Sequence, residues 1–120
     1  MPGKVLVVDD DPTVIVTIRE ALAEHGVLVE GAGDAAGASR LLDTHTFCGL
    51  ILDLVLDDSS GFDVLRELER RNLLLPTVVV SEKLPSYVRE MLSEDQVKLV
   101  FAKPVDTRLI AAVVLGLCGV

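Results

Sequence analysis

The sequence predicts an α/β fold, a doubly wound parallel sheet of five strands with five helices on its two faces. The first observation is that five short apolar runs recur along the chain, separated by stretches whose apolar residues lie three or four positions apart. The second is that these runs are almost uninterrupted, which is typical of strands buried on both faces of a parallel sheet.

The first half of the chain predicts two strands and two helices. The run VLVV (5–8) is the first strand, and DDDP supplies a capping acid and a helix-starting proline for the helix after it. The run VLV (27–29) is the second strand, and GD precedes the second helix. The apolar positions that indicate these helices are Val14, Ile18 and Leu22, then Ala35, Ala38, Leu41 and Leu42.

The second half continues the alternation. Its strands are CGLIL (48–52), LPTVVV (75–80) and VKLVF (97–101), and the turns SSG, LPS and PVD precede the third, fourth and fifth helices. The apolar positions are Phe62, Leu65 and Leu68 in the third helix and Val88, Met91 and Leu92 in the fourth, and the fifth follows from Asp106. No linker or repeat interrupts the chain, so we expect residues 1–120 to form one domain.

Charge and hydropathy limit the classes of partner. Eleven basic against 19 acidic residues give a net charge of −8, so we expect no contact with nucleic acid and instead a cation or a basic protein surface. The longest apolar run, 109–120, is shorter than the roughly 20 residues that cross a bilayer, and the start of the chain lacks the features of a secretory signal. We therefore expect no membrane association and a cytoplasmic location.

Cys48 and Cys118 have no metal-like spacing, and we expect both to be reduced, packed cysteines.

Polar and charged residues stand where the predicted strands end. Asp9 and Asp10 follow the first strand, Asp53 the third, Ser81 the fourth and Lys103 the fifth. Because ligands of doubly wound sheets bind at the carboxyl ends of the strands, we expect these side chains to converge.

These residue types together indicate phosphoryl chemistry on a metal. Neighbouring carboxylates at the mouth of a buried strand repel one another and are partly desolvated, so they need a cation. Oxygen ligands without a histidine or a thiolate suit Mg²⁺. A lysine and a hydroxyl beside the metal hold the oxygens of a phosphoryl group, and a carboxylate on that metal attacks phosphorus to give an acyl phosphate.

With these motifs the chain resembles the receiver domain of bacterial two-component response regulators over essentially its whole length. The matching pieces are LVVDDDP, LILDLVLDDSSG with Gly61 eight residues past Asp53, VVVS and FAKP, in the order and spacing of the family. The resemblance implies a flavodoxin-like (CheY-like) sheet with strand order 2-1-3-4-5. It also implies a signalling module and not an enzyme.

The resemblance assigns the metal site to four residues. It implies that Asp53 is the phosphoacceptor and also a metal ligand, that Asp10 binds Mg²⁺ directly, and that Asp9 binds it through water. It implies that Val55 contributes its backbone carbonyl, so its apolar side chain is no objection.

The resemblance also implies roles in switching and a partner. Ser81 matches the hydroxyl that turns toward the phosphoryl group, and Lys103 matches the lysine that pairs with it. The phosphodonor implied is a sensor histidine kinase or a phosphotransfer protein.

Other interpretations compete at several of these residues. Asp11 is better explained as a helix cap than as a ligand, because Pro12 follows in the favoured first-turn position. A capping role also competes for Ser81, whereas Lys103 at a strand end facing three carboxylates favours a buried ion pair over an exposed lysine.

Three positions depart from the pattern of the family. Glu82 follows Ser81 where a small residue is usual, which predicts crowding or repulsion of a phosphodonor. Asp57 replaces the usual proline four residues past Asp53, and Val100 stands where an aromatic switch residue is frequent.

These departures leave two alternatives to a working receiver. One is a degenerate receiver that binds a partner without phosphorylation. The other is a phosphatase of the haloacid dehalogenase type, since VVDDDPTV fits its first motif and Ser81 and Lys103 match later ones. Residues 105–120 offer only Asp106 for the further acidic pair of those enzymes, and Asp53 would have no role in them.

The fifth predicted helix is unusually apolar, with no charge in the twelve residues from 109 to 120. An amphipathic helix needs only part of its circumference to be apolar. We therefore expect a homodimer or an effector contact through the helix at 106–118, involving Ile110, Val113, Val114 and Leu117. The competing interpretation is that this helix is simply well buried.

Overall fold

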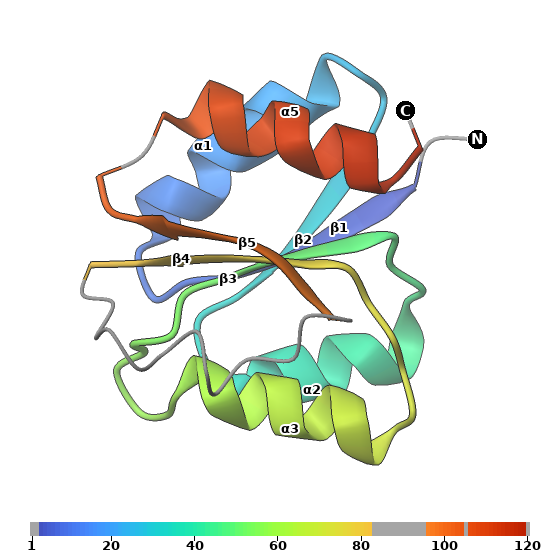
Figure 1. Ribbon diagram of the computed structural model, residues 1–120, viewed down its shortest axis with the longest axis vertical. Coiled ribbons are helices and arrows are strands. Elements are labelled where there is room, and N and C mark those ends of the chain that lie inside the picture. The colour runs from blue at the N-terminus through green and yellow to red at the C-terminus, as the bar shows by residue number, and fades with distance from the viewer. Residues whose placement is uncertain (1–2, 83–95, 105, 120) are drawn as a thin grey trace.

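The computed structural model describes residues 3–82, 96–104 and 106–119, and it confirms the predicted fold class. The five strands are parallel and lie in the order β2-β1-β3-β4-β5. Figure 1 shows α1 and α5 on one face of the sheet and α2 and α3 on the other. The predicted fourth helix, at Val88, Met91 and Leu92, lies outside the described residues. The elements are β1 Lys4–Val8, α1 Pro12–Ala23, β2 Leu28–Ala32, α2 Ala35–Thr44, β3 Gly49–Leu52, α3 Gly61–Arg70, β4 Thr77–Ser81, β5 Val97–Ala102 and α5 Thr107–Leu117.

The uninterrupted apolar strands form two cores because successive side chains point to opposite faces of the sheet. Under α1 and α5, Val5, Val7 and Ile51 pack with helix residues such as Ile18 and Leu22. Under α2 and α3 the alternate strand positions pack with helix residues; they include Leu6, Val8, Leu50, Leu52 and Val79. The sheet is therefore covered on both faces, as its composition predicted.

Side chains cap the starts of all four helices that the structure describes. Asp11 accepts a hydrogen bond from the backbone N–H of Thr13 at 2.9 Å, which confirms its predicted capping role. Asp34 and Asp106 cap α2 and α5 in the same way, and Ser60 forms a capping box at α3. Each cap satisfies N–H groups that have no partner inside the helix.

The second strand is longer than its apolar run, because its backbone pairs with β1 from Leu28 through Ala32. Gly31 lies inside this strand, and a Cβ there would come within 2.6 Å of the Ile15 side chain. The glycine thus allows α1 to pack closely on β2, which an apolar-run criterion does not detect.

Burial of α5 shows that two of its four predicted docking residues, Ile110 and Val114, are wrong. Ile110 is 1% exposed and Val114 is fully buried against the sheet, while Val113 and Leu117 are half-buried against the same core. The competing interpretation, a well-buried helix, is confirmed for Ile110 and Val114. Leu109, at 50% exposure, is the large apolar side chain of α5 that reaches the surface.

The cysteines also differ from the prediction. Cys48, just before β3, and Cys118, at the end of α5, form a disulfide across 70 residues of sequence, so they are not two reduced thiols. Their wide separation in the chain gave no spacing signal. Packing of the α5 carboxyl end over the start of β3 brings their Cα atoms to 5.0 Å.

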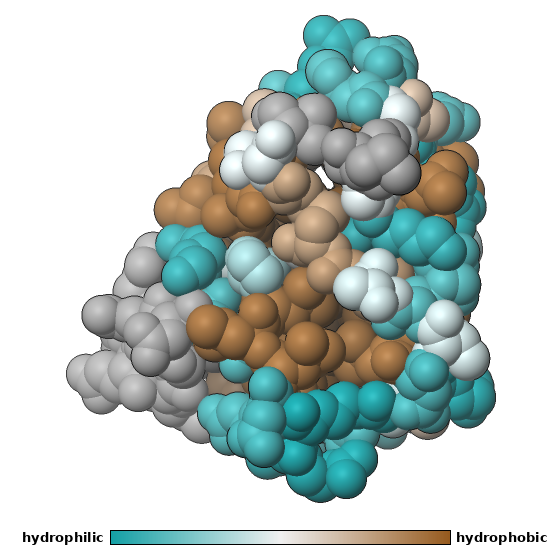
Figure 2. Space-filling model, turned by 90° about the vertical axis from the view of Figure 1, so that its right-hand side faces the viewer, coloured by the Kyte–Doolittle hydropathy of each residue, from teal (hydrophilic) through white to brown (hydrophobic). Residues whose placement is uncertain are grey.

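The end of the sheet where the strands begin carries exposed leucines. Leu28 is the first residue of β2, and Leu73 and Leu74 lie in the connection before β4; they are 61%, 42% and 69% exposed. Figure 2 shows apolar residues gathered across the middle of this face, with hydrophilic residues around them.

Among the helices described, none has both the length and the apolar character to cross a membrane.

Two adjacent residues of α5 test whether this helix is core. We expect Ile110→Ala to lower the free energy of unfolding by about 3 kcal/mol, because it removes the contacts of a buried side chain with the core under α1 and α5. We expect Leu109→Ala to change it by less than about 0.5 kcal/mol, because that side chain is half exposed. Urea unfolding of both variants measures the difference, and equal effects would contradict this packing of α5.

Candidate metal and phosphoryl site

The strand order brings the predicted site residues to one edge of the sheet. Asp9 follows β1 and Asp53 follows the neighbouring β3, so the two carboxylates are side by side. Backbone hydrogen bonds continue past the strand ends, from Asp9 N–H to the Ala32 carbonyl at 3.0 Å and from Asp53 N–H to the Val8 carbonyl at 2.9 Å. The sheet itself therefore positions both carboxylates.

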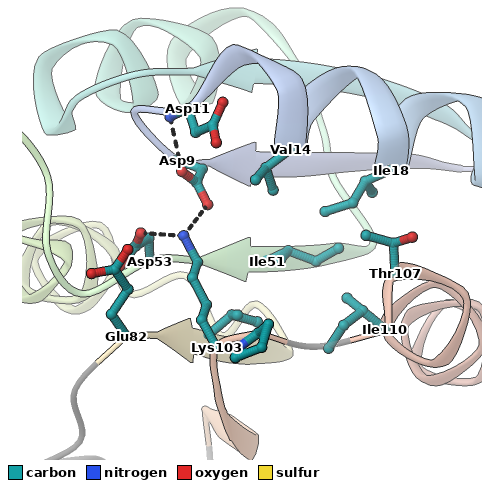
Figure 3. A pocket seen from close by; sticks show the side chains of 12 residues that line it. Asp9, Asp11, Val14, Ile18, Ile51, Asp53, Glu82, Lys103, Thr107 and Ile110 are labelled. Carbon is teal, nitrogen blue, oxygen red and sulfur yellow. Dashed lines mark hydrogen bonds and ion pairs between the residues drawn. The ribbon is translucent and has the colours of Figure 1, made fainter.

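Lys103 joins the two carboxylates (Figure 3). Its Nζ lies 3.0 Å from Asp9 Oδ2 and 2.8 Å from Asp53 Oδ2, which confirms the predicted buried ion pair. The carboxylate side chains are 5% exposed and the lysine side chain is 20% exposed. Burial lowers the pKa of Lys103, but hydrogen bonds to Asp53 and Asp9 outweigh it, so the pKa is raised and the ammonium is charged.

A backbone amide orients the second oxygen of each carboxylate. Asp9 Oδ1 accepts from the N–H of Asp11, and Asp53 Oδ1 accepts from the N–H of Val55, both at 2.9 Å. Burial still raises the pKa of Asp9 above its ordinary value, because it outweighs the hydrogen bonds from Asp11 and Lys103. Lys103 and the Asp11 amide therefore compensate the burial of Asp9 only in part.

A third acid completes a cluster that fits a divalent cation. Asp9, Asp10 and Asp53 each offer a carboxylate oxygen, and these oxygens lie within 4.8 Å of one another. Desolvation raises the pKa of Asp10, and the neighbouring carboxylates of Asp57 and Asp53 raise it further. A hard cation relieves this repulsion and accepts oxygen ligands of this kind. Asp57 beside Asp10 is a contact that the sequence motifs did not predict.

Ser81 lies at the predicted place, but its hydroxyl joins no described partner. It is fully buried at the end of β4, and its carbonyl accepts from the N–H of Lys103 at 2.7 Å. Its Oγ has no hydrogen-bond partner among the described residues. Its alternative role as a cap of the fourth helix lies outside them.

Val55 and Gly61 hold the backbone around Asp53. The Val55 side chain is 62% exposed, and its backbone N–H is the group that contacts Asp53. Gly61 donates its N–H to the Leu54 carbonyl at 3.0 Å, and a Cβ on it would overlap the Asp53 carbonyl oxygen. The glycine eight residues past Asp53 is therefore required by the close approach of α3 to the site.

The three residues that depart from the receiver pattern, Glu82, Asp57 and Val100, lie in different places. Glu82 is exposed and lines the same cavity as Asp53, toward which its side chain points in Figure 3. Asp57 is exposed beside Asp10. Val100 is half-buried on β5, against the core under α2 and α3.

Comparison with known proteins agrees with this geometry. The family model "Response regulator receiver domain" matches residues 5–115. The chain belongs to the response regulator receiver domain family.

Curated relatives are longer regulators. The alginate biosynthesis transcriptional regulatory protein AlgB of Pseudomonas putida is 29% identical over 123 residues, which cover 92% of this chain and 28% of AlgB. The probable transcriptional regulatory protein TcrX of Mycobacterium tuberculosis is 35% identical over 82 residues, which cover 68% of this chain and 35% of TcrX. The chain thus spans about a third or less of the relatives it matches.

Solved receiver structures share the fold. The non-phosphorylated HemR receiver domain of Leptospira biflexa has a TM-score of 0.87 at 23% identity, covering 100% of this chain and 96% of that chain. The receiver domain of sensor histidine kinase PA1611 of Pseudomonas aeruginosa, described with a magnesium ion in its active site cleft, has a TM-score of 0.79 at 19% identity. That match covers all of both chains.

The raised pKa of Asp9 predicts a pH-dependent stability. A raised pKa means that the charged carboxylate destabilises the fold, so this cost is present above the folded pKa and absent below the ordinary value of 3.8. Without divalent cations we expect Asp9→Asn to be more stable than the wild type at pH 7. Urea unfolding between pH 7 and pH 4 should show the two stabilities converging as the pH falls. A variant that is less stable at pH 7 would mean that the ion pair with Lys103 outweighs burial.

Proposed function

We propose that this domain accepts a phosphoryl group on Asp53 from the phosphohistidine of a sensor histidine kinase or a phosphotransfer protein. One observation carries the proposal: the Asp53 carboxylate is held by Lys103 and the Val55 amide, within reach of the oxygens of Asp9 and Asp10. A nucleophile, a lysine for the phosphoryl oxygens and ligands for a cation therefore meet at one edge of the sheet.

The metal proposed for this site is Mg²⁺. Asp10 and Asp53 are its direct carboxylate ligands, Asp9 binds through water, and the Val55 carbonyl completes the protein ligands. Bound there, Mg²⁺ neutralises the charge that gathers on the transferred phosphoryl group. The relative PA1611, described with magnesium in its cleft, supports this choice.

Three residues of the chain have different roles in the phosphoryl transfer. An oxygen of Asp53 attacks phosphorus as the phosphorus–nitrogen bond to the donor histidine breaks, and the product is an aspartyl phosphate. Lys103, already 2.8 Å from Asp53 Oδ2, pairs with a phosphoryl oxygen. The buried hydroxyl of Ser81 has no described partner, and an unsatisfied group of this kind costs about 1–3 kcal/mol. A phosphoryl oxygen supplies the acceptor it lacks.

The output of the domain is proposed to pass through the exposed part of the region at 106–118. Ile110 and Val114 are core, so a second copy of the chain or an effector would contact the side of α5 that carries Leu109. Ser81 and Lys103 are joined through the backbone at the ends of β4 and β5, which links the site to the strand that leads into α5. We further propose that residues 1–120 act as one receiver domain in the cytoplasm.

A phosphorylation-independent binding module is a second candidate, favoured by one observation. Glu82 lies at the rim of the cavity that Asp53 lines, and it adds negative charge where an anionic donor arrives. The phosphatase alternative finds no such support, because Asp11, the second acid of its first motif, is engaged as the cap of α1.

Neighbouring aspartates distinguish the metal ligand from the helix cap. We expect Mg²⁺ to shift the backbone amides near Asp10 and Asp53 in NMR spectra, and Asp10→Asn to weaken binding by about tenfold or more because it removes a charged ligand. Asp11→Asn is the matched control and should bind as the wild type, because asparagine also caps helices. Equal affinities in wild type and Asp10→Asn would contradict the ligand assignment.

The phosphoacceptor is identified by modification with a small donor. Acetyl phosphate or phosphoramidate with Mg²⁺ should add a single acid-stable, base-labile phosphoryl group, seen as one adduct by intact mass. The adduct should be absent in Asp53→Asn, because the amide is no nucleophile. An adduct on Asp9 or Asp11 instead would favour the phosphatase-like chemistry, and no adduct on any residue would favour the phosphorylation-independent module.

The charge of Glu82 should slow this reaction. We expect Glu82→Ala to raise the rate of modification by acetyl phosphate about threefold to tenfold, because it removes both repulsion and bulk at the rim. Glu82→Gln separates the two causes, since it keeps the size of the side chain and removes its charge. Rates that are unchanged in both variants would show that Glu82 does not limit access to Asp53.

A further inference from the structure

A cavity of about 530 Å³ opens beside the phosphoryl site and extends between α1 and α5. Its floor is the sheet, at Ile51 and Val80, and its walls are Val14 and Ile18 from α1 and Ile110 from α5. Figure 3 shows the side chains of Val14, Ile18, Ile51 and Ile110 around a common space, to one side of Lys103. Its size is typical of sites for small molecules, which are mostly apolar with a few polar groups at one end.

None of the proposed phosphoryl chemistry uses the apolar part of this cavity. Asp53, Lys103 and Asp9 lie at its mouth, whereas the apolar floor and walls belong to the core face under α1 and α5. Thr107, at the start of α5, adds a hydroxyl to the wall. The space therefore exists in addition to what a phosphoryl group and a metal require.

The mouth of the cavity is negatively charged. Four carboxylates line it, those of Asp9, Asp11, Asp53 and Glu82, against one ammonium, that of Lys103. The ammonium is already shared by Asp9 and Asp53, so an anion would have to displace them. Asp11 uses Oδ1 as a helix cap, and its other carboxylate oxygen makes no hydrogen bond within the described part of the chain.

We propose that this cavity binds a small molecule with an apolar body and a cationic amine head group. The body lies between Val14, Ile51 and Ile110, and the head lies at the mouth, near the carboxylate of Asp11. Burial of the body removes apolar surface from water, and the head meets an unshared carboxylate oxygen. Binding does not require phosphorylation of Asp53, so its test is independent of the proposed function.

Three compounds with the same phenylalkyl body and different heads test the proposal. The amine 4-phenylbutylamine, the alcohol 4-phenylbutanol and the carboxylate 4-phenylbutyrate are titrated into ¹⁵N-labelled protein at pH 7. We expect saturable shifts of the amides of Val14, Ile51 and Ile110, with the amine binding about tenfold more tightly than the carboxylate and the alcohol in between. A carboxylate that binds as tightly as the amine, shifts that lie elsewhere, or no saturable shift would overturn the proposal.

Two variants assign the ends of the ligand. Asp11→Asn, which keeps the helix cap, should weaken binding of the amine about threefold and leave the alcohol unchanged, whereas Glu20→Gln, an exposed acid of α1 outside the cavity, should change neither. Val14→Phe fills the apolar part of the cavity and should weaken the binding of all three compounds. If Val14→Phe does not fold, the Asp11 and Glu20 pair decides, and equal effects of those two variants on the amine would overturn the placement of the head.

Discussion

The ion pair of Lys103 with Asp9 and Asp53 is the interaction on which the arrangement of this edge of the sheet depends. Two nearly buried carboxylates on neighbouring strands repel each other, and burial disfavours the charge on each. Lys103 follows β5, which is separated from β3 by β4, so its side chain reaches across a strand to join them. Breaking a buried pair of this kind leaves an uncompensated charge, which is why the three residues act as a unit.

This arrangement could be predicted because it follows from topology. Uninterrupted apolar runs indicate a parallel sheet, and in a parallel sheet the residues after the strands meet at one edge. Asp11 was recognised as a cap from Pro12 beside it, and Lys103 as a paired lysine from its place at a strand end. In both cases the signal lay within two or three residues of the chain.

The misjudged features depend on contacts between distant segments. Ile110 and Leu109 are adjacent apolar residues of one helix, and only the packing of α5 on the sheet makes the first core and the second surface. The disulfide of Cys48 and Cys118 joins residues 70 positions apart. Composition shows that a helix is apolar, but it does not show how many of its sides are covered.

Two acids outside the family motifs, Asp57 and Glu82, both make the site more negatively charged. Asp57 stands beside Asp10, and Glu82 lies at the rim of the cavity that Asp53 lines. Lys103 is already shared by two carboxylates, so it offers little compensation to either of these additional acids. Added negative charge strengthens attraction for a cation and opposes the approach of an anionic phosphodonor, and both effects act at the same edge of the sheet. Occupation of the site by a cation should therefore matter more for phosphorylation here than in a receiver with a proline and a small residue at these two positions.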